Sequence, residues 1–162
     1  MEKPSIAVDF FVDERWGKAT VVGEIPMEIC SGAFDKETEF GDAELTGRII
    51  GAAIEVHRNL GPGLLESVYE ATLALELNRI GLLVERQKAV SIDYKGLKFD
   101  EGFRIDLLVA QKVVLELKCV EAILPIHEAQ TISYLKLASL RIGLLINFKT
   151  PVLHRGIKRF LI

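Results

Sequence analysis

Hydrophobic residues recur at helical spacing in two consecutive segments of the chain. The first predicts a helix over residues 46–60, with Thr46 as its N-cap, which the Gly-Pro-Gly turn at 61–63 ends. The second predicts a helix over residues 64–80, with Gly81 at the position of a C-terminal cap. The apolar positions of the first helix are Ile49, Ile50, Ala53, Ile54 and Val56.

Three segments rich in β-branched residues follow, at 82–94, 97–109 and 112–120. Short links join them, so we expect antiparallel pairing. A helix over 125–139 and an apolar strand over 142–148 come next, and the helical crossover makes the last pairing parallel. The order predicts an α/β (α+β) fold in which helices flank a mixed central sheet. The final HRGIKRFLI carries no prediction of its own.

The N-terminal segment, residues 1–42, differs from the rest of the chain. Two short apolar runs, SIAVDFFV and ATVVGEIPMEI, predict a hairpin or added strands, and a polar stretch after them predicts a linker. Residues 1–45 hold 11 acidic and 4 basic side chains, whereas residues 46–162 hold 12 acidic and 16 basic ones. We therefore expect an acidic extension, 1–42, and one folded domain, 43–162.

Composition narrows the class of protein. A chain of 162 residues that is 49% hydrophobic and 27% charged is typical of a globular domain. We see no secretory leader and no uncharged run long enough to span a bilayer. We therefore expect a cytoplasmic protein without a membrane partner. Two cysteines and three histidines, all far apart, predict neither a disulfide framework nor a structural zinc site. The basic balance of the body is compatible with a polyanionic partner, and equally with a neutral domain beside an acidic segment.

Charged residues interrupt two of the predicted strands. Alternation along VVLELKCV sends Glu116 and Lys118 to one face, and a hairpin about Gln111 sets Asp106 across from the Glu116 region. Carboxylates suit Mg²⁺ or Mn²⁺, and a lysine beside such an ion can orient water or stabilise charge on phosphorus. The same pattern also fits a salt-bridged hairpin face in contact with solvent.

Two further sets of residues are candidates for the same site. Glu66 lies in the first turn of the second helix, in register with the apolar Tyr69, where a favourable interaction with the helix N-terminus is the simpler explanation. Gln130 and Tyr134 stand one turn apart on the third helix and could reach one ligand, although such pairs commonly line a helix surface.

The motifs that contain these residues resemble those of a known protein family. Asp106, nine residues, then Glu116-Leu117-Lys118 resembles the PD-(D/E)xK nuclease superfamily, with Ile105 where the superfamily name has proline. Within GLLESVYE, Gly63, Glu66 and Tyr69 resemble the signature of the GxxExxY protein family of that superfamily. The resemblance covers about Glu44 to Ile162. It implies a restriction-endonuclease-like core of order α-β-β-β-α-β, with an extra N-terminal helix.

The resemblance also implies roles. Asp106 and Glu116 would bind Mg²⁺ or Mn²⁺, helped by the main-chain carbonyl of Leu117, and Glu66 would join the metal shell directly or through water. Lys118 would position the nucleophilic water or steady the pentacovalent phosphorane. Tyr69, Gln130 and Tyr134 would support the site or contact nucleic acid.

The expected function is metal-dependent hydrolysis of phosphodiester bonds in nucleic acid, with DNA favoured over RNA as the substrate. Phosphoryl chemistry needs charge neutralisation and an aligned water more than a covalent nucleophile. The alternative is a catalytically silent nuclease-fold module that binds nucleic acid or a protein partner. A third interpretation is a nuclease that needs an accessory protein and is inactive alone, and a homodimer is compatible with each of the three.

Overall fold

The computed structural model describes residues 10–13, 18–21 and 42–162, with side chains from residue 42 onward except those of residues 100 and 101. Contacts divide the chain into Met1–Gly41 and Asp42–Ile162. In the first unit, β1 (Phe10–Asp13) and β2 (Lys18–Val21) pair antiparallel. The other parts of the predicted N-terminal runs, and the linker, lie outside the described residues.

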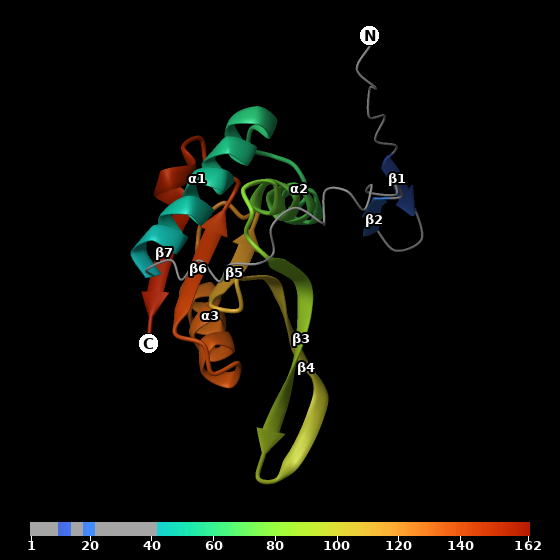
Figure 1. Cartoon of the computed structure of the whole chain (residues 1–162), viewed down its shortest axis with the longest axis vertical. Coiled ribbons are helices and arrows are strands. Elements are labelled where there is room, and N and C mark those ends of the chain that lie inside the picture. Colours follow the sequence, from blue (N-terminus) through green and yellow to red (C-terminus); the bar gives the residue numbers. More distant parts are fainter. Residues whose placement is uncertain (1–9, 14–17, 22–41) are drawn as a thin grey trace. The chain divides into compact units, whose positions relative to one another are not determined.

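The second unit is built on a five-stranded sheet of order β3-β4-β5-β6-β7 (Figure 1). β5 and β6 are parallel and the other neighbours are antiparallel, which confirms the predicted mixed sheet. β7 had no sequence prediction, because charged residues interrupt its short run. The strands are β3 (Val84–Tyr94), β4 (Leu97–Val109), β5 (Val113–Lys118), β6 (Ile142–Asn147) and β7 (Ile157–Leu161).

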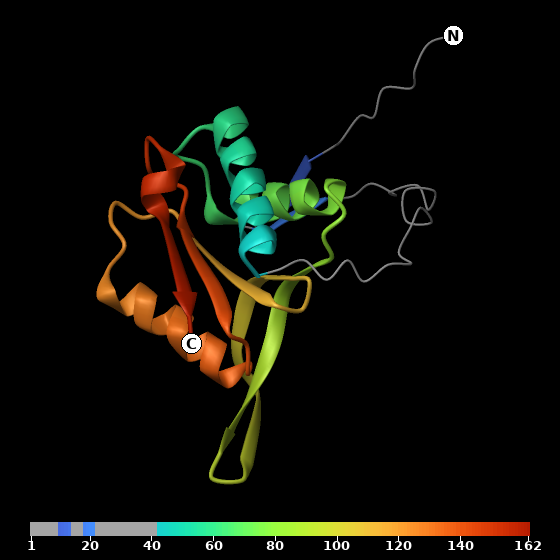
Figure 2. The same ribbon diagram turned by 60° about the vertical axis from the view of Figure 1, so that its left-hand side comes forward.

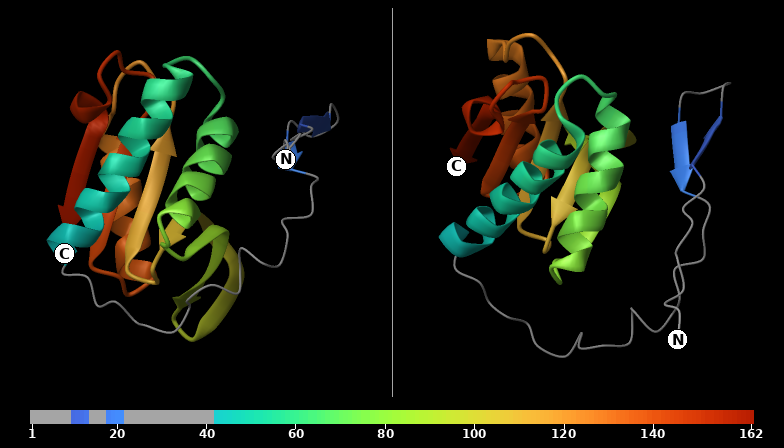
Figure 3. Two further views of the ribbon diagram at one scale, coloured as in Figure 1. Left: turned by 45° about the horizontal axis from the view of Figure 1, so that its top comes forward. Right: turned by 90° about the horizontal axis from the view of Figure 1, so that it is seen from above.

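Helices cover both faces of this sheet. Figures 2 and 3 show α1 (Asp42–Leu60) and α2 (Glu66–Arg79) on one face and α3 (Pro125–Leu137) on the other. The central strands β5 and β6 are therefore buried along almost their whole length. This arrangement is the predicted restriction-endonuclease-like fold, with α1 as its extra N-terminal helix. Among the described helices, none is long and apolar enough to cross a membrane.

The first helix begins earlier than predicted. It starts at Asp42, so Thr46 is an interior residue and not the N-cap. Its hydroxyl donates a hydrogen bond of 2.9 Å to the Asp42 carbonyl, one turn back. The acidic Asp42 and Glu44 suit the positive end of the helix dipole, and Leu45 is buried in the core. These contacts extend the helix beyond the periodic apolar run.

The second helix is shorter than predicted at its start. Gly63 has a φ of 104°, which favours glycine, and Leu65, two residues later, is extended, so the helix begins at Glu66. Its end matches the prediction, because Gly81 adopts a φ of 78° and donates a 2.9 Å hydrogen bond to the Asn78 carbonyl. The turn between α1 and α2 thus fixes where Glu66 enters the structure.

Aromatic and aliphatic side chains form the core on both sides of the sheet. Under α1 and α2, the Tyr69 ring stacks on Phe148 at 4.3 Å. Under α3, Gly143 of β6 allows close approach, since a Cβ there would lie 3.0 Å from Leu135 Cδ1. The buried cluster on the α3 side comprises Ile105, Leu108, Val114 and Leu135.

Candidate active site where β4 and β5 diverge

Strands β4 and β5 pair over only three residues each. The last pair before they separate is Leu107 with Leu115, and Asp106 and Glu116 are the next residues of the two strands. Beyond this point β4 continues in a hairpin with β3, while β5 stays paired with β6. The N–H groups on the β4 edge of β5 therefore need other partners.

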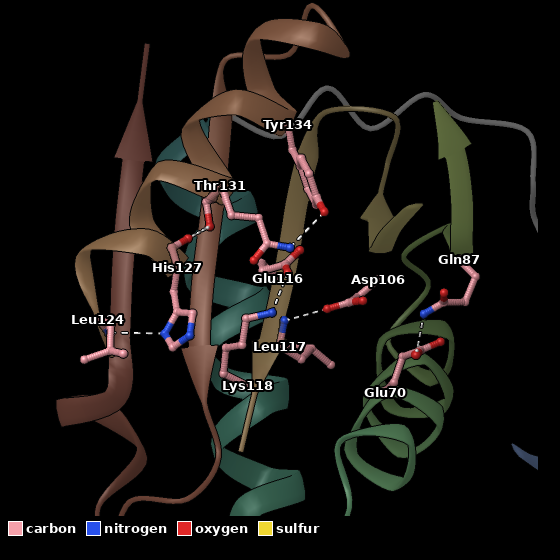
Figure 4. Close-up of polar contacts among 11 residues, drawn as sticks. Glu70, Gln87, Asp106, Glu116, Leu117, Lys118, Leu124, His127, Thr131 and Tyr134 are labelled. Atoms are coloured by element: carbon pink, nitrogen blue, oxygen red, sulfur yellow. Dashed lines mark hydrogen bonds and ion pairs between the residues drawn. The ribbon is translucent and has the colours of Figure 1, made fainter. Parts of the chain in front are cut away.

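Two carboxylates lie near those N–H groups. Asp106 Oδ2 accepts a 2.8 Å hydrogen bond from the Leu117 N–H (Figure 4). Glu66, the first residue of α2, lies near the Cys119 N–H, which opposes the rise that burial causes in the pKa of this carboxyl group. A strand residue directs its N–H and C=O to the same edge, so the Leu117 carbonyl faces the same gap. The divergence thus gathers Asp106, Glu66 and the main chain of Leu117.

Glu116 and Lys118 lie on one face of β5, as the alternation predicted. Lys118 Nζ is 2.6 Å from Glu116 Oε1, and both side chains are largely buried. Glu116 is only 2% exposed, and its second oxygen, Oε2, has no hydrogen-bond partner among the described residues. A buried carboxylate oxygen without a partner costs about 1–3 kcal/mol or more, so this atom calls for a ligand.

The carboxylates influence one another. Burial, and then the charge of Asp106, raise the pKa of Glu116 to about 7, against the bond from Lys118. Burial also raises the pKa of Asp106, opposed first by the Leu117 N–H. The pKa of Glu66 rises by burial of its carboxylate, although the residue as a whole is exposed on the first turn of α2. Such mutual perturbation is typical of functional sites.

Lys118 remains a cation in this setting. Burial alone would lower its pKa, but the hydrogen bond to Glu116 and the charges of Glu116, Glu66 and Asp106 outweigh it and raise the pKa. A permanent positive charge therefore stands among three carboxylates.

The donor set suits a hard divalent cation. All the available ligand atoms are oxygens, which Mg²⁺ and Mn²⁺ prefer. One of them is the unpartnered Oε2 of Glu116, and the charge of Asp106 acts on this side chain. Within the part of the chain that the structure describes, no three His, Cys, Asp or Glu side chains already form a metal cage. Protein donors hold the carboxylates instead: Leu117 N–H binds Asp106 and Lys118 binds Glu116.

The other predicted site residues are Tyr69, Gln130 and Tyr134, beside the four charged residues Glu66, Asp106, Glu116 and Lys118. Gln130 Nε2 donates a 2.8 Å hydrogen bond to the Tyr134 hydroxyl, and the Tyr134 ring stacks on Phe103 at 4.0 Å. Both belong to α3, which covers the face of β5 that carries Glu116 (Figure 4). Neither side chain is hydrogen-bonded to the four charged groups in the described residues.

Tyr69 is fully buried and bonded to the turn before α2. Its hydroxyl donates to the Gly61 carbonyl and accepts a 3.2 Å hydrogen bond from the Leu64 N–H. Of the two roles predicted for it, this position fits support of the site and not contact with nucleic acid.

Two residues near the site were not predicted from the sequence. On α2, Glu70 is buried as a whole residue, at 8% exposed, whereas Glu66 is exposed apart from its carboxylate. Gln87 of β3 donates a 2.7 Å hydrogen bond to Glu70 Oε2. The spacing of four between Glu66 and Glu70 could have suggested a shared helix face. No sequence signal pointed to Gln87.

A family model described as the PD-(D/E)XK nuclease superfamily matches residues 43–160. The chain belongs to the PD-(D/E)XK nuclease superfamily. Membership indicates a nuclease function and a nucleic-acid substrate, and members generally use divalent metals such as Mg²⁺. No curated protein and no solved structure matches the chain.

Proposed function

We propose that the chain is an active metal-dependent nuclease that hydrolyses phosphodiester bonds, with DNA as the preferred substrate over RNA. Within the PD-(D/E)XK superfamily we assign it to the GxxExxY proteins, on the strength of Gly63, Glu66 and Tyr69. The observation that carries the proposal is Glu116 Oε2, a buried carboxylate oxygen without a partner, beside Asp106 and Lys118.

Asp106, Glu116 and the Leu117 carbonyl would hold the cation, with Glu66 contributing directly or through water. A divalent ion there supplies charge neutralisation at the phosphate and lowers the pKa of water. Its binding would also satisfy Glu116 Oε2 and relieve the repulsion between Asp106 and Glu116.

Lys118 has a separate role in this proposal. Its ammonium has three donors, of which the bond to Glu116 uses one. The other two can orient the attacking water or stabilise charge that develops on the phosphoryl oxygens. Its raised pKa keeps it protonated at neutral pH.

The experiment is cleavage of single- and double-stranded DNA and RNA by the purified chain with Mg²⁺, Mn²⁺ or EDTA. We expect cleavage that EDTA abolishes, and losses of about a hundredfold or more in Asp106→Asn and Lys118→Ala. Matched controls are Asp93→Asn and Lys112→Ala, which change the same residue types at exposed positions outside the site.

Each outcome of this experiment has a defined meaning. Cleavage that survives Asp106→Asn and Lys118→Ala would identify a contaminant and remove the proposal. Metal-independent binding of nucleic acid without cleavage would instead favour the silent module.

A further inference from the structure

Two adjacent residues of β3 bind the same buried carboxylate. Arg86 Nε lies 2.9 Å from Glu70 Oε1, and Gln87 Nε2 donates to Glu70 Oε2 at 2.7 Å (Figure 4 draws the second contact). Successive side chains of a regular strand point to opposite faces, so a regular strand would not direct both of them to one carboxylate.

The backbone conformation of Gln87 explains how both side chains reach Glu70. Its φ is 49°, in the left-handed region that residues other than glycine seldom adopt. Such a conformation costs on the order of 1–2 kcal/mol and persists only where surrounding contacts fix it. The bonds to Glu70 therefore hold Gln87 in a conformation that its own backbone disfavours.

Gln87 also stands across from Asp106. The pairs on either side of it are Arg86 with Leu107 and Lys88 with Ile105, so Gln87 and Asp106 occupy the position between them. Burial raises the pKa of Asp106, and the nearby Gln87 amide acts weakly in the opposite direction, as expected of a side chain at the facing position. An amide nitrogen carries two hydrogens, which is enough for one carboxylate on each side.

We propose that Gln87 is a positioning residue that holds the Asp106 carboxylate in place for the divalent cation, and that Glu70 fixes the Gln87 amide for this task. In this proposal Gln87, from the facing position on β3, adds to the hydrogen bond that Asp106 already accepts from Leu117 of β5. This inference rests on the proposed metal-dependent function. It adds Gln87 and Glu70, neither of which needs to touch the metal or the substrate.

The test is Mn²⁺ affinity of the full chain, measured by titration calorimetry without nucleic acid. Gln87→Asn is the variant of choice because asparagine tolerates the left-handed region, yet its shorter side chain cannot span Glu70 and Asp106. We expect Mn²⁺ binding to weaken about tenfold or more, the usual effect of removing a residue that orients a metal ligand. Gln87→Gly, which also accepts the positive φ, is the second variant if the first fails to fold.

Gln111 provides a matched control. Its φ is 54°, and its amide donates to the Glu85 carboxylate beside the turn between β4 and β5, not to Asp106 or Glu70. Gln111→Asn therefore disturbs the same kind of contact and backbone, and should leave Mn²⁺ affinity unchanged.

A second readout separates positioning from loss of structure. The Mn²⁺ concentration for half-maximal cleavage should rise in Gln87→Asn by the same factor as the dissociation constant. A smaller fraction of folded protein would lower the rate without moving that concentration.

Wild-type Mn²⁺ affinity in Gln87→Asn, with cleavage intact in both proteins, would overturn the positioning role and leave the nuclease proposal standing. A wild-type chain that binds no Mn²⁺ would overturn the metal-dependent function, and this inference with it.

Discussion

The environment of Glu116 disfavours the charged form of its carboxylate. Its pKa of about 7, against 4.5 for an ordinary glutamate, means that the folded protein favours the protonated form. A group with a raised folded-state pKa adds stability below the unfolded-state value and loses that contribution as pH rises through the folded-state value. The Glu116 contribution is thus complete below pH 4.5 and is lost as pH rises to about 7.

This shift predicts a pH-dependent difference between the wild type and Glu116→Gln. In EDTA, the free energy of unfolding of the wild type should fall relative to that of the variant by up to about 3 kcal/mol between pH 4.5 and pH 8. Urea unfolding of both proteins across this range measures the difference. Parallel stability curves would show that Glu116 ionises normally in the fold.

The sequence allowed part of the residue-level site to be predicted. Alternation along β5 correctly set Glu116 and Lys118 on one face, because a strand has a fixed period of two. Glu70 and Gln87 could not be predicted this way, since their contact depends on a positive φ in the middle of β3. Local strain of this kind leaves no mark on hydrophobic periodicity.

At the scale of elements, the turn between α1 and α2 determines where Glu66 stands. The Tyr69 hydroxyl joins the Gly61 carbonyl to the Leu64 N–H, and its ring packs on Phe148. The Gly-Pro-Gly stop and the Gly81 cap were visible in the sequence, because both depend on local backbone preference. The early start of α1 at Asp42 was not visible, since packing of Leu45 decides it.

We expect Tyr69→Phe to lower the free energy of unfolding by about 1–2 kcal/mol. The variant keeps the stacked ring and removes only the hydroxyl that bonds two backbone groups of the turn. Tyr94→Phe is the control, because Tyr94 is 60% exposed on the β3–β4 hairpin and should change stability by less than about 0.5 kcal/mol. Equal effects of the two substitutions would remove the structural role given to Tyr69.

At the scale of the whole molecule, the described core lies within Asp42–Ile162, and the superfamily match covers residues 43–160. The order of helices and strands in this unit was predictable, because each element has its own period and the links are short. The edge strand β7 was not, since residues such as Lys158 and Arg159 hide its alternation.

We propose that residues 42–162 are an autonomous domain and that residues 1–41 are an extension. A chain that begins at Asp42 should unfold in one transition, with a free energy of unfolding within about 0.5 kcal/mol of the full chain. Chemical denaturation of both proteins checks this. A large loss of stability on truncation would show that the extension is part of the fold.

The central claim is that Asp106 and Glu116 share one divalent cation where β4 and β5 diverge. The most direct measurement is a crystal soaked with Mn²⁺ and examined for anomalous scattering. The account predicts a single strong peak within coordination distance, roughly 2.0–2.4 Å, of both carboxylates. A fully occupied Mn²⁺ site elsewhere, or none at millimolar concentration with both side chains ordered, would contradict it.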